Sequence, residues 1–279
     1  MKKFLALTLS LVFCLAVLAG CGQKTPAEGN AAAGETKTIK VAASPVPHTD
    51  ILKVAGEVLA AEGITLEVVE MSDYREPNFA TESGDVTANY FQHIAYLEKF
   101  NKDENTHLVN VAEIHYEPYG LYPGKTATIA GLAPGAKIAI SNDPSNEARA
   151  LRLLEAQGLI TLKEGTGLEA TPLDISENKL KLDFKEMEAA QLPGALSSVD
   201  MAVINGNYAI GAGLSVKNDA IAVEKNTDSD SAAKYANVLV VKEGNENNEL
   251  VEALVKALKS DKVRDYINET YDGAVVPLF

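Results

Sequence analysis

The sequence predicts an α/β protein built from two lobes, with a hinge that the chain crosses twice. Two observations lead to this class. Short apolar strands alternate with amphipathic helices over most of the chain, and a strand and a helix are left over after two such units. Strands separated by helices are expected to pair in parallel, with helices on both faces of each sheet. A cleft is then expected at the carboxyl ends of the strands.

The first unit is predicted to start with a strand at 39–42, which passes through Ser44-Pro45-Val46-Pro47 into a helix. Gly63 is expected to end that helix as a C-terminal cap. Its apolar face consists of Ile51, Val54, Ala55, Val58 and Leu59. The pattern then predicts strands at 64–69, 86–90 and 107–114, and a helix over 93–102.

The second unit is predicted to start with a strand at 137–141 and a helix that ends at Gly158. Asn142 or Asp143 can cap this helix, and Pro144 suits its first turn. Further strands are expected at 184–189, 200–205 and 235–241, and the last helix carries Leu250, Leu254 and Leu258. We therefore expect lobe 1 to comprise 38–120 plus 225–279, and lobe 2 to comprise 121–224.

The N-terminal segment has the pattern of a cleaved secretion signal, predicted to comprise 1–20. Lys2 and Lys3 precede an apolar run that is shorter than the roughly 20 residues of a membrane-spanning helix. Small residues lead to Cys21, which is expected to become the lipidated N-terminus, although an ordinary signal with an incidental cysteine is the alternative. Residues 21–37 are predicted to form a flexible linker, so the protein is expected on the outer face of the cell membrane.

Composition excludes several classes of partner and site. The chain carries 25 basic and 39 acidic residues, and loss of the signal leaves 23 basic residues and a net charge of −16. This charge disfavours nucleic acid and anionic membrane surfaces. The only cysteines are Cys14 and Cys21, so the mature body has no disulfide and depends on packed cores. A monomer is expected.

Signatures of catalysis are missing, so an enzyme is not expected. The chain has no nucleophile elbow, no phosphate-binding loop and no Rossmann glycine pattern, and no cofactor is expected. Its histidines are His48, His93, His107 and His115, which lack the short spacings of metal ligands. No metal site is therefore predicted.

Three segments are candidates for a ligand site, and each has a plainer alternative. In the block 141–149, a strand end feeds a helix start, and Arg149 lies about one turn inside the helix; an ordinary surface salt bridge would give the same pattern. The block 90–96 holds three aromatic residues and His93, which could instead be a core cluster. Asn205 and Asn237 are polar residues at strand ends, where asparagine is usually a turn residue.

Together these segments resemble the methionine-binding lipoproteins of the NlpA family, over essentially the whole mature chain. The resemblance is carried by Asp73-Tyr74 with Pro77-Asn78, by Asp85 to His93 with Tyr96-Leu97, by Asn142-Asp143-Pro144 with Asn146 and Arg149, by Gln191-Leu192-Pro193, by Ala202 to Asn205 with Tyr208, and by Gly273-Ala274-Val275. It implies the type II fold of periplasmic binding proteins. It also implies that Arg149 takes the ligand carboxylate, that Asn205 and Asn237 fix the polar end, and that an enclosure surrounds the side chain. The residues of that enclosure are Tyr74, Phe91, His93 and Tyr96.

The function that the resemblance implies is capture of methionine, as the L- or D-isomer or a close relative, for delivery to an ABC permease and its ATPase. Another apolar amino acid or a short peptide is the alternative ligand, and a surface adhesin is the alternative class of protein. The resemblance further predicts that Arg149→Ala greatly weakens binding and leaves folding nearly intact.

Overall fold

The computed structural model describes residues 37–225 and 233–279. The predicted signal peptide and Cys21 lie outside the described residues, and so does the predicted linker apart from Lys37. That residue is already the first of strand β1, so the folded body starts one residue earlier than expected. Among the described residues, no helix has the length and apolar character needed to cross a membrane.

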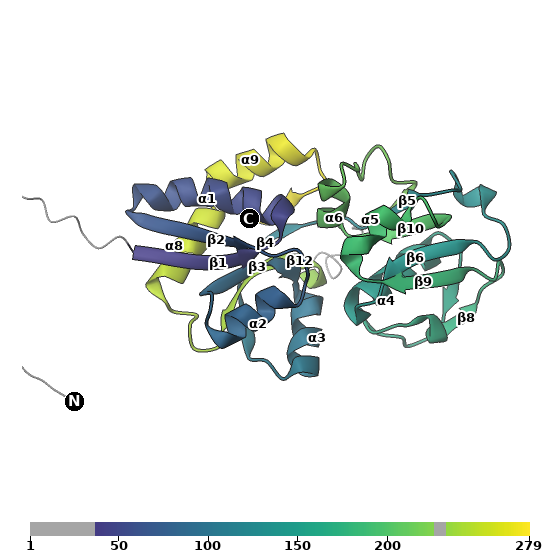
Figure 1. Ribbon diagram of the computed structural model, residues 1–279, viewed down its shortest axis with the longest axis horizontal. Coiled ribbons are helices and arrows are strands. Elements are labelled where there is room, and N and C mark those ends of the chain that lie inside the picture. The colour runs from purple at the N-terminus through teal and green to yellow at the C-terminus, as the bar shows by residue number, and fades with distance from the viewer. Residues whose placement is uncertain (1–36, 226–232) are drawn as a thin grey trace, which may run out of the picture. The chain divides into compact units, whose positions relative to one another are not determined.

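The first sheet has six strands and is assembled from both ends of the described chain (Figure 1). In spatial order they are β13 (Val276–Pro277), β4 (Leu108–Tyr116), β12 (Ala236–Lys242), β3 (Ala88–His93), β1 (Lys37–Ala43) and β2 (Ile64–Glu70).

The second sheet has five strands, and all of them come from the middle of the chain. Their order is β11 (Ala222–Val223), β5 (Gly120–Pro123), β10 (Met201–Ile204), β6 (Lys137–Ser141) and β9 (Asp183–Met187). A separate ladder joins β7 (Thr161–Leu162) to β8 (Ile175–Glu177). The chain thus passes between the two sheets after β4 and again before β12. The predicted lobe boundaries, at 120/121 and 224/225, stay a prediction.

The expectation of parallel pairing is confirmed for part of each sheet, and the remaining strands are antiparallel. Strand β1 pairs in parallel with β2 and β3, and β6 pairs in parallel with β9 and β10. However, β12 is antiparallel to β3 and β4, and β5 is antiparallel to β10. The reason is topological: β5 and β12 are the strands that enter a sheet directly from the other sheet. They start at the edge where the neighbouring strands end, so they run in the opposite direction.

Eight α-helices and four short helical turns accompany the strands in the described residues. The α-helices are α1 (Asp50–Ala61), α2 (Glu76–Ser83), α3 (Ile94–Glu104), α4 (Pro144–Ala156), α5 (Leu192–Ala195), α6 (Gly206–Gly211), α8 (Glu249–Leu258) and α9 (Asp261–Tyr271). The turns are η1 (Pro45–Thr49), η2 (Ile129–Gly131), η3 (Pro172–Asp174) and η4 (Ala189–Gln191).

The predicted helix signals are confirmed where local rules apply. Gly63 and Gly158 follow α1 and α4 with φ of 75° and 72°, the left-handed conformation that glycine tolerates best. Asp143 caps α4, since its Oδ1 accepts a hydrogen bond from the Asn146 amide at 3.0 Å. Helix α9 was not predicted from the sequence.

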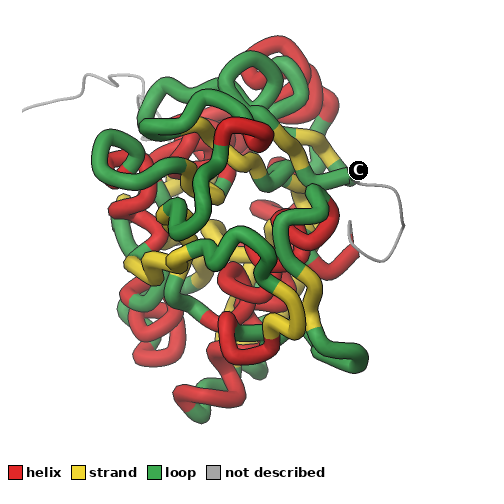
Figure 2. Tube along the Cα trace, turned by 90° about the vertical axis from the view of Figure 1, so that its right-hand side faces the viewer, coloured by secondary structure: helices red, strands yellow, loops and turns green. Residues whose placement is uncertain are grey.

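Both faces of each sheet are buried, because helices pack on both sides. Alternate strand residues point in opposite directions, so each strand contributes side chains to both faces. In the first sheet Ile39 and Val41 face α1, α8 and α9, whereas Val238 and Val240 face α3. In the second sheet Ile138 packs with α4, and Ala139 packs with α5 and α6 on the other side. At the end of the molecule formed by the second sheet, Figure 2 shows that much of the chain is loop.

Candidate functional site

A cavity lies where the carboxyl ends of the parallel strands of both sheets meet. Its lining consists of Tyr74, Phe91, Gln92, His93, Tyr96, Glu117, Asn146, Arg149, Asn205, Gly206, Asn207 and Asn237. All seven residues predicted from the sequence are among them. Asn237 belongs to an antiparallel strand, but it lies near the strand's start and therefore reaches the same edge.

The cavity is narrow in this structure, with a volume of about 20 Å³. An amino acid is larger than this, so its entry would require side chains or lobes to move apart. A larger cavity of about 580 Å³ adjoins it, and Tyr74 and Tyr96 line both cavities.

One end of the cavity is aromatic. The Tyr74 ring lies 5.9 Å from Phe91 and 5.7 Å from Tyr96, centroid to centroid. The hydroxyl of Tyr74 donates to Asn207 Oδ1 at 2.5 Å, and the hydroxyl of Tyr96 donates to the carbonyl of Tyr74 at 2.9 Å. Because these hydroxyls already have protein partners, the rings offer apolar surface to a ligand.

His93 lies beside this aromatic end as a neutral ring. Burial, with the nearby charge of Arg149, lowers its pKa to about 3. Its Nδ1 accepts from the Tyr96 amide at 3.1 Å, so its Nε2 carries the proton and donates to Asn146 Oδ1 at 3.1 Å. Both nitrogens are occupied, which leaves the ring itself as the part that can contact a ligand.

Arg149 is buried and already paired. Its Nε lies 3.1 Å and 3.2 Å from the two carboxylate oxygens of Glu224, and its Nη2 donates to Glu224 at 2.6 Å and to the carbonyl of Glu117 at 2.9 Å. Its guanidinium carbon lies 4.1 Å from the ring centroid of Tyr235. These bonds involve Nε and Nη2, so Nη1 is the nitrogen of this side chain with no hydrogen-bond partner among the described residues.

Glu224 was missed by the sequence analysis, and it changes the expectation for Arg149. Although burial alone would raise the pKa of Glu224, the Arg149 guanidinium holds that pKa below its usual value. Removing Arg149 would leave a largely buried carboxylate without its cation. The structure therefore indicates that Arg149→Ala disturbs folding as well as binding.

The two predicted asparagines have different hydrogen-bonding capacity. Asn205 is engaged by the protein, because its Oδ1 accepts from the Tyr119 hydroxyl at 3.0 Å and its Nδ2 donates to Asn146 Oδ1 at 3.0 Å. Asn237 uses Oδ1 toward His48 Nε2 at 3.0 Å. Its Nδ2 has no hydrogen-bond partner in the described part of the chain, so Asn237 can donate to a ligand.

Glu117 is the second carboxylate that the sequence analysis missed. It follows β4, it is only 6% exposed, and it lines the cavity. Burial raises the pKa of its carboxyl group, while His48, the Asn207 backbone amide and Arg149 act in the opposite direction. Gly206 permits its position, since a Cβ built there would lie 2.6 Å from Glu117 Oε2. No short motif marked this glutamate in the sequence.

The histidine spacing argument also missed a contact. Atoms of His48, His115 and Glu117 that could serve as metal ligands lie within 4.8 Å of one another. His115 and Glu117 are only two positions apart, whereas His48 is distant along the chain and joins them because η1 packs near the end of β4. The prediction that the chain holds no metal stays a prediction.

Two packed α/β lobes, with a polar and aromatic cavity between them, define the architecture of a solute-binding protein. The model of the NlpA lipoprotein family matches residues 39–279. The chain belongs to the NlpA lipoprotein family.

Named relatives and a solved structure fit this placement. Membrane lipoprotein TpN32 of Treponema pallidum is 44% identical, over 86% of this chain and 88% of its own. The methionine-binding lipoprotein MetQ of Bacillus subtilis is 39% identical, over 100% of this chain and 99% of its own. A nutrient-binding protein of Burkholderia cenocepacia bound to methionine superposes with a TM-score of 0.82 and 42% identity, over 86% of this chain and 100% of its own.

Proposed function

We propose that this protein is the extracytoplasmic binding component of an ABC importer and that it captures methionine in the cavity between its lobes. The observation that carries the proposal is the division of the cavity into a polar and an aromatic end. The family and the ligands of the named relatives support it.

The polar end matches a zwitterion. Arg149 Nη1 and Asn237 Nδ2 are donors without described partners, and they suit the ligand carboxylate. The Glu117 carboxylate suits the ligand ammonium. The charge of Arg149 is matched by Glu224, so the ligand's own two charges need only be matched by local hydrogen bonds and by Glu117.

The aromatic end matches a thioether. Tyr74, Phe91 and Tyr96 present ring edges and faces, and His93 adds a neutral ring. Sulfur contacts with aromatic rings contribute about 0.3–1.5 kcal/mol each, and the flexible methionine chain adapts to an irregular space. The aromatic end of the cavity would therefore select the side chain of the ligand by its shape and polarisability rather than by hydrogen bonds.

Titration calorimetry tests the ligand. The body without its lipid should be unfolded and refolded to remove carried-over solute, and then titrated with L-methionine, D-methionine, leucine and a methionine dipeptide. Heat with either methionine isomer, and weaker binding of leucine, is expected. If leucine or the dipeptide binds more tightly, the same site serves another ligand, and if none binds the transport proposal is wrong.

Glu117→Gln tests the polar end. The variant removes the anion and keeps nearly the same shape, so methionine affinity should fall by roughly 10-fold or more. Glu113→Gln is the matched control, because Glu113 lies on β4, the strand that Glu117 follows, with its side chain exposed. An unchanged affinity in Glu117→Gln would assign the ammonium to another group.

The remaining parts of the proposal concern location and partners. Lipidated Cys21 would hold the monomeric protein on the outer face of the membrane, and the open edge of the cavity would face an ABC permease that is driven by its ATPase. Co-purification from detergent extracts, with the permease as bait and with methionine present or absent, tests the contact. Absence of the protein from every such eluate would count against it.

A further inference from the structure

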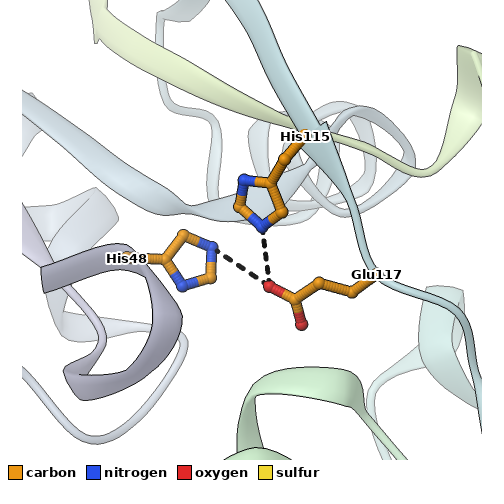
Figure 3. A group of neighbouring side chains, drawn as sticks. All are labelled: His48, His115 and Glu117. Atoms are coloured by element: carbon orange, nitrogen blue, oxygen red, sulfur yellow. Dashed lines mark hydrogen bonds and ion pairs between the residues drawn. The ribbon is translucent and has the colours of Figure 1, made fainter. Parts of the chain in front are cut away.

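Two buried histidines stand directly behind the polar end of the cavity. His48 lies in η1 and His115 lies in β4, and Figure 3 shows both rings directed at Glu117. Neither ring lines the cavity, and each is at most 1% exposed. They contact two groups that do line it, Glu117 and Asn237.

The hydrogen bonds of His115 fix its tautomer. Its Nε2 lies 2.8 Å from Glu117 Oε1; when Glu117 is ionised, as binding of an ammonium requires, the carboxylate can only accept, so Nε2 carries the proton. Its Nδ1 then accepts from the Tyr90 hydroxyl. Burial lowers the pKa of His115 to about 3, which keeps the ring neutral. Tyr90 therefore donates a hydrogen bond to His115, and His115 donates one to Glu117.

His48 forms a parallel chain. Its Nδ1 lies 2.8 Å from the Ser44 hydroxyl, and its Nε2 lies 3.0 Å from Asn237 Oδ1 and 3.6 Å from Glu117 Oε1. Both neighbours of Nε2 are acceptors, so Nε2 is the protonated nitrogen and Nδ1 accepts from Ser44. This turns the Asn237 carboxamide so that its oxygen points inward and its Nδ2 is left for the ligand.

A metal ion is the other use of such a cluster, and the hydrogen bonds disfavour it. Every ring nitrogen of His48 and His115 already has an oxygen partner, so no buried nitrogen is left over to require a cation. To bind a tetrahedral zinc ion, both Nε2 atoms would have to lose the protons that they donate to Asn237 and Glu117.

We propose that His48 and His115 are positioning residues for ligand recognition, each serving a different end of the amino acid. His115 holds the Glu117 carboxylate for the ammonium, and His48 holds Asn237 as a donor for the carboxylate. The inference rests on the proposed function. Binding would then require both a free ammonium and a free carboxylate on the ligand. A different buried histidine would support the recognition of each group.

The test uses ligands that lack one end. For His115→Leu, methionine affinity should fall roughly 10- to 100-fold, whereas the affinity for 4-(methylthio)butanoate, which lacks the ammonium, should stay nearly unchanged. For His48→Leu, methionine affinity should fall similarly, whereas that for methioninamide, which lacks the carboxylate, should fall clearly less, because His48 lies closer to Asn237 (3.0 Å) than to Glu117 (3.6 Å). A merely structural role would weaken both ligands equally in each variant.

Conservative variants and a control complete the design. Glutamine places an amide donor near the position of Nε2, so His115→Gln and His48→Gln should recover part of the affinity. If a leucine variant does not fold, Tyr90→Phe and Ser44→Ala remove the outer hydroxyls instead and should show the same selective loss. His107→Leu is the matched control, because His107 is exposed and contacts Glu82 at 3.3 Å.

The outcomes separate the two proposals. If the unmodified protein does not bind methionine, the proposed function fails. If it binds methionine but the variants lose all ligands alike, only the positioning role fails. Equimolar zinc in the purified protein, lost together with His48 or His115, would overturn the positioning role and make the cluster a metal site.

Discussion

The pairing of Arg149 with Glu224 gives the sharpest prediction about stability. The side chains are 4% and 14% exposed, and the shortest of their contacts is 2.6 Å. In Arg149→Met, the partners left to Glu224 within residues 37–225 and 233–279 would be the Tyr116 hydroxyl at 2.6 Å and the Tyr119 amide at 3.4 Å. Removing one partner of a buried ion pair costs about 3–5 kcal/mol, because the other charge stays buried.

The magnitude can be checked by denaturation and calorimetry. For a body of this size, a loss of about 3–5 kcal/mol lowers the Tm by roughly 6–20 °C. The double variant Arg149→Met with Glu224→Gln should regain much of that stability, since the stranded charge is gone. It should not regain methionine binding, because Nη1 is missing, and the loss should be about 30-fold or more.

A matched control and a refuting result belong to this experiment. Lys256→Met breaks an exposed pair with Glu62, whose side chains are 80% and 45% exposed, and should change stability by at most about 1 kcal/mol. If Arg149→Met melts like the unmodified protein, or if the double variant is no more stable than the single one, the buried pair does not contribute as argued.

Three further predictions concern other parts of the molecule. Gly206→Ala should destabilise the protein by about 1–3 kcal/mol and weaken binding, because the new Cβ would lie 2.7 Å from Glu117 Cβ; Gly211→Ala, on the same helix with no atom near its Cβ, should be neutral in urea denaturation. Glu147 has a buried Oε1 with no hydrogen-bond partner in the described parts of the chain. Burial, with Glu186 and Asp143 nearby, raises the pKa of Glu147 to about 7, so the folded state holds this proton to higher pH than the unfolded state does. The cost of ionising it is absent at pH 4.5 and complete above pH 7, and Glu147→Gln should therefore stabilise the protein by about 2–3 kcal/mol at pH 8 and little at pH 4.5; an equal effect at both pH values would contradict the shift. Cys21→Ser should release the protein from membranes on fractionation, and continued sedimentation with them would reject the lipid anchor.

Local signals in the sequence located most elements, because they act over one or two turns. Gly63, Gly158 and Asp143 end or begin helices as expected. Helix α9 had such signals too: Ser260 accepts from the Val263 amide, and Val263, Ile267 and Tyr271 recur every four residues on its buried face. Its polar composition concealed them. The direction of β5 and β12 depends on where the chain crosses between sheets, which no local pattern encodes.

The site was predictable because the family resemblance pointed to strand termini and to the segments and helices that follow strands. Arg149 and Tyr96 came from such helices, and the structure gathers all seven predicted residues around one cavity. Most of the supporting groups were not predictable, because their contacts join distant parts of the chain; the exception in spacing is His115 with Glu117, two positions apart, which no motif marked. Arg149 and Glu224 are separated by 75 positions, and His48 and Asn237 by 189. Spacing rules for salt bridges and metal ligands cover a few residues at most, so they cannot identify these pairs.

The direction of β1 places the start of the described chain far from the cavity. Lys37 begins this strand, and Ala43 ends it next to Ser44 and His48, close behind the cavity. Seven residues of strand extend roughly 23 Å, so Lys37 lies about that far from the end of the strand beside the cavity. If Cys21 anchors the protein as proposed, a pull from the membrane would act on the amino end of an interior strand rather than on the cavity. Solute could then exchange while the protein stayed attached.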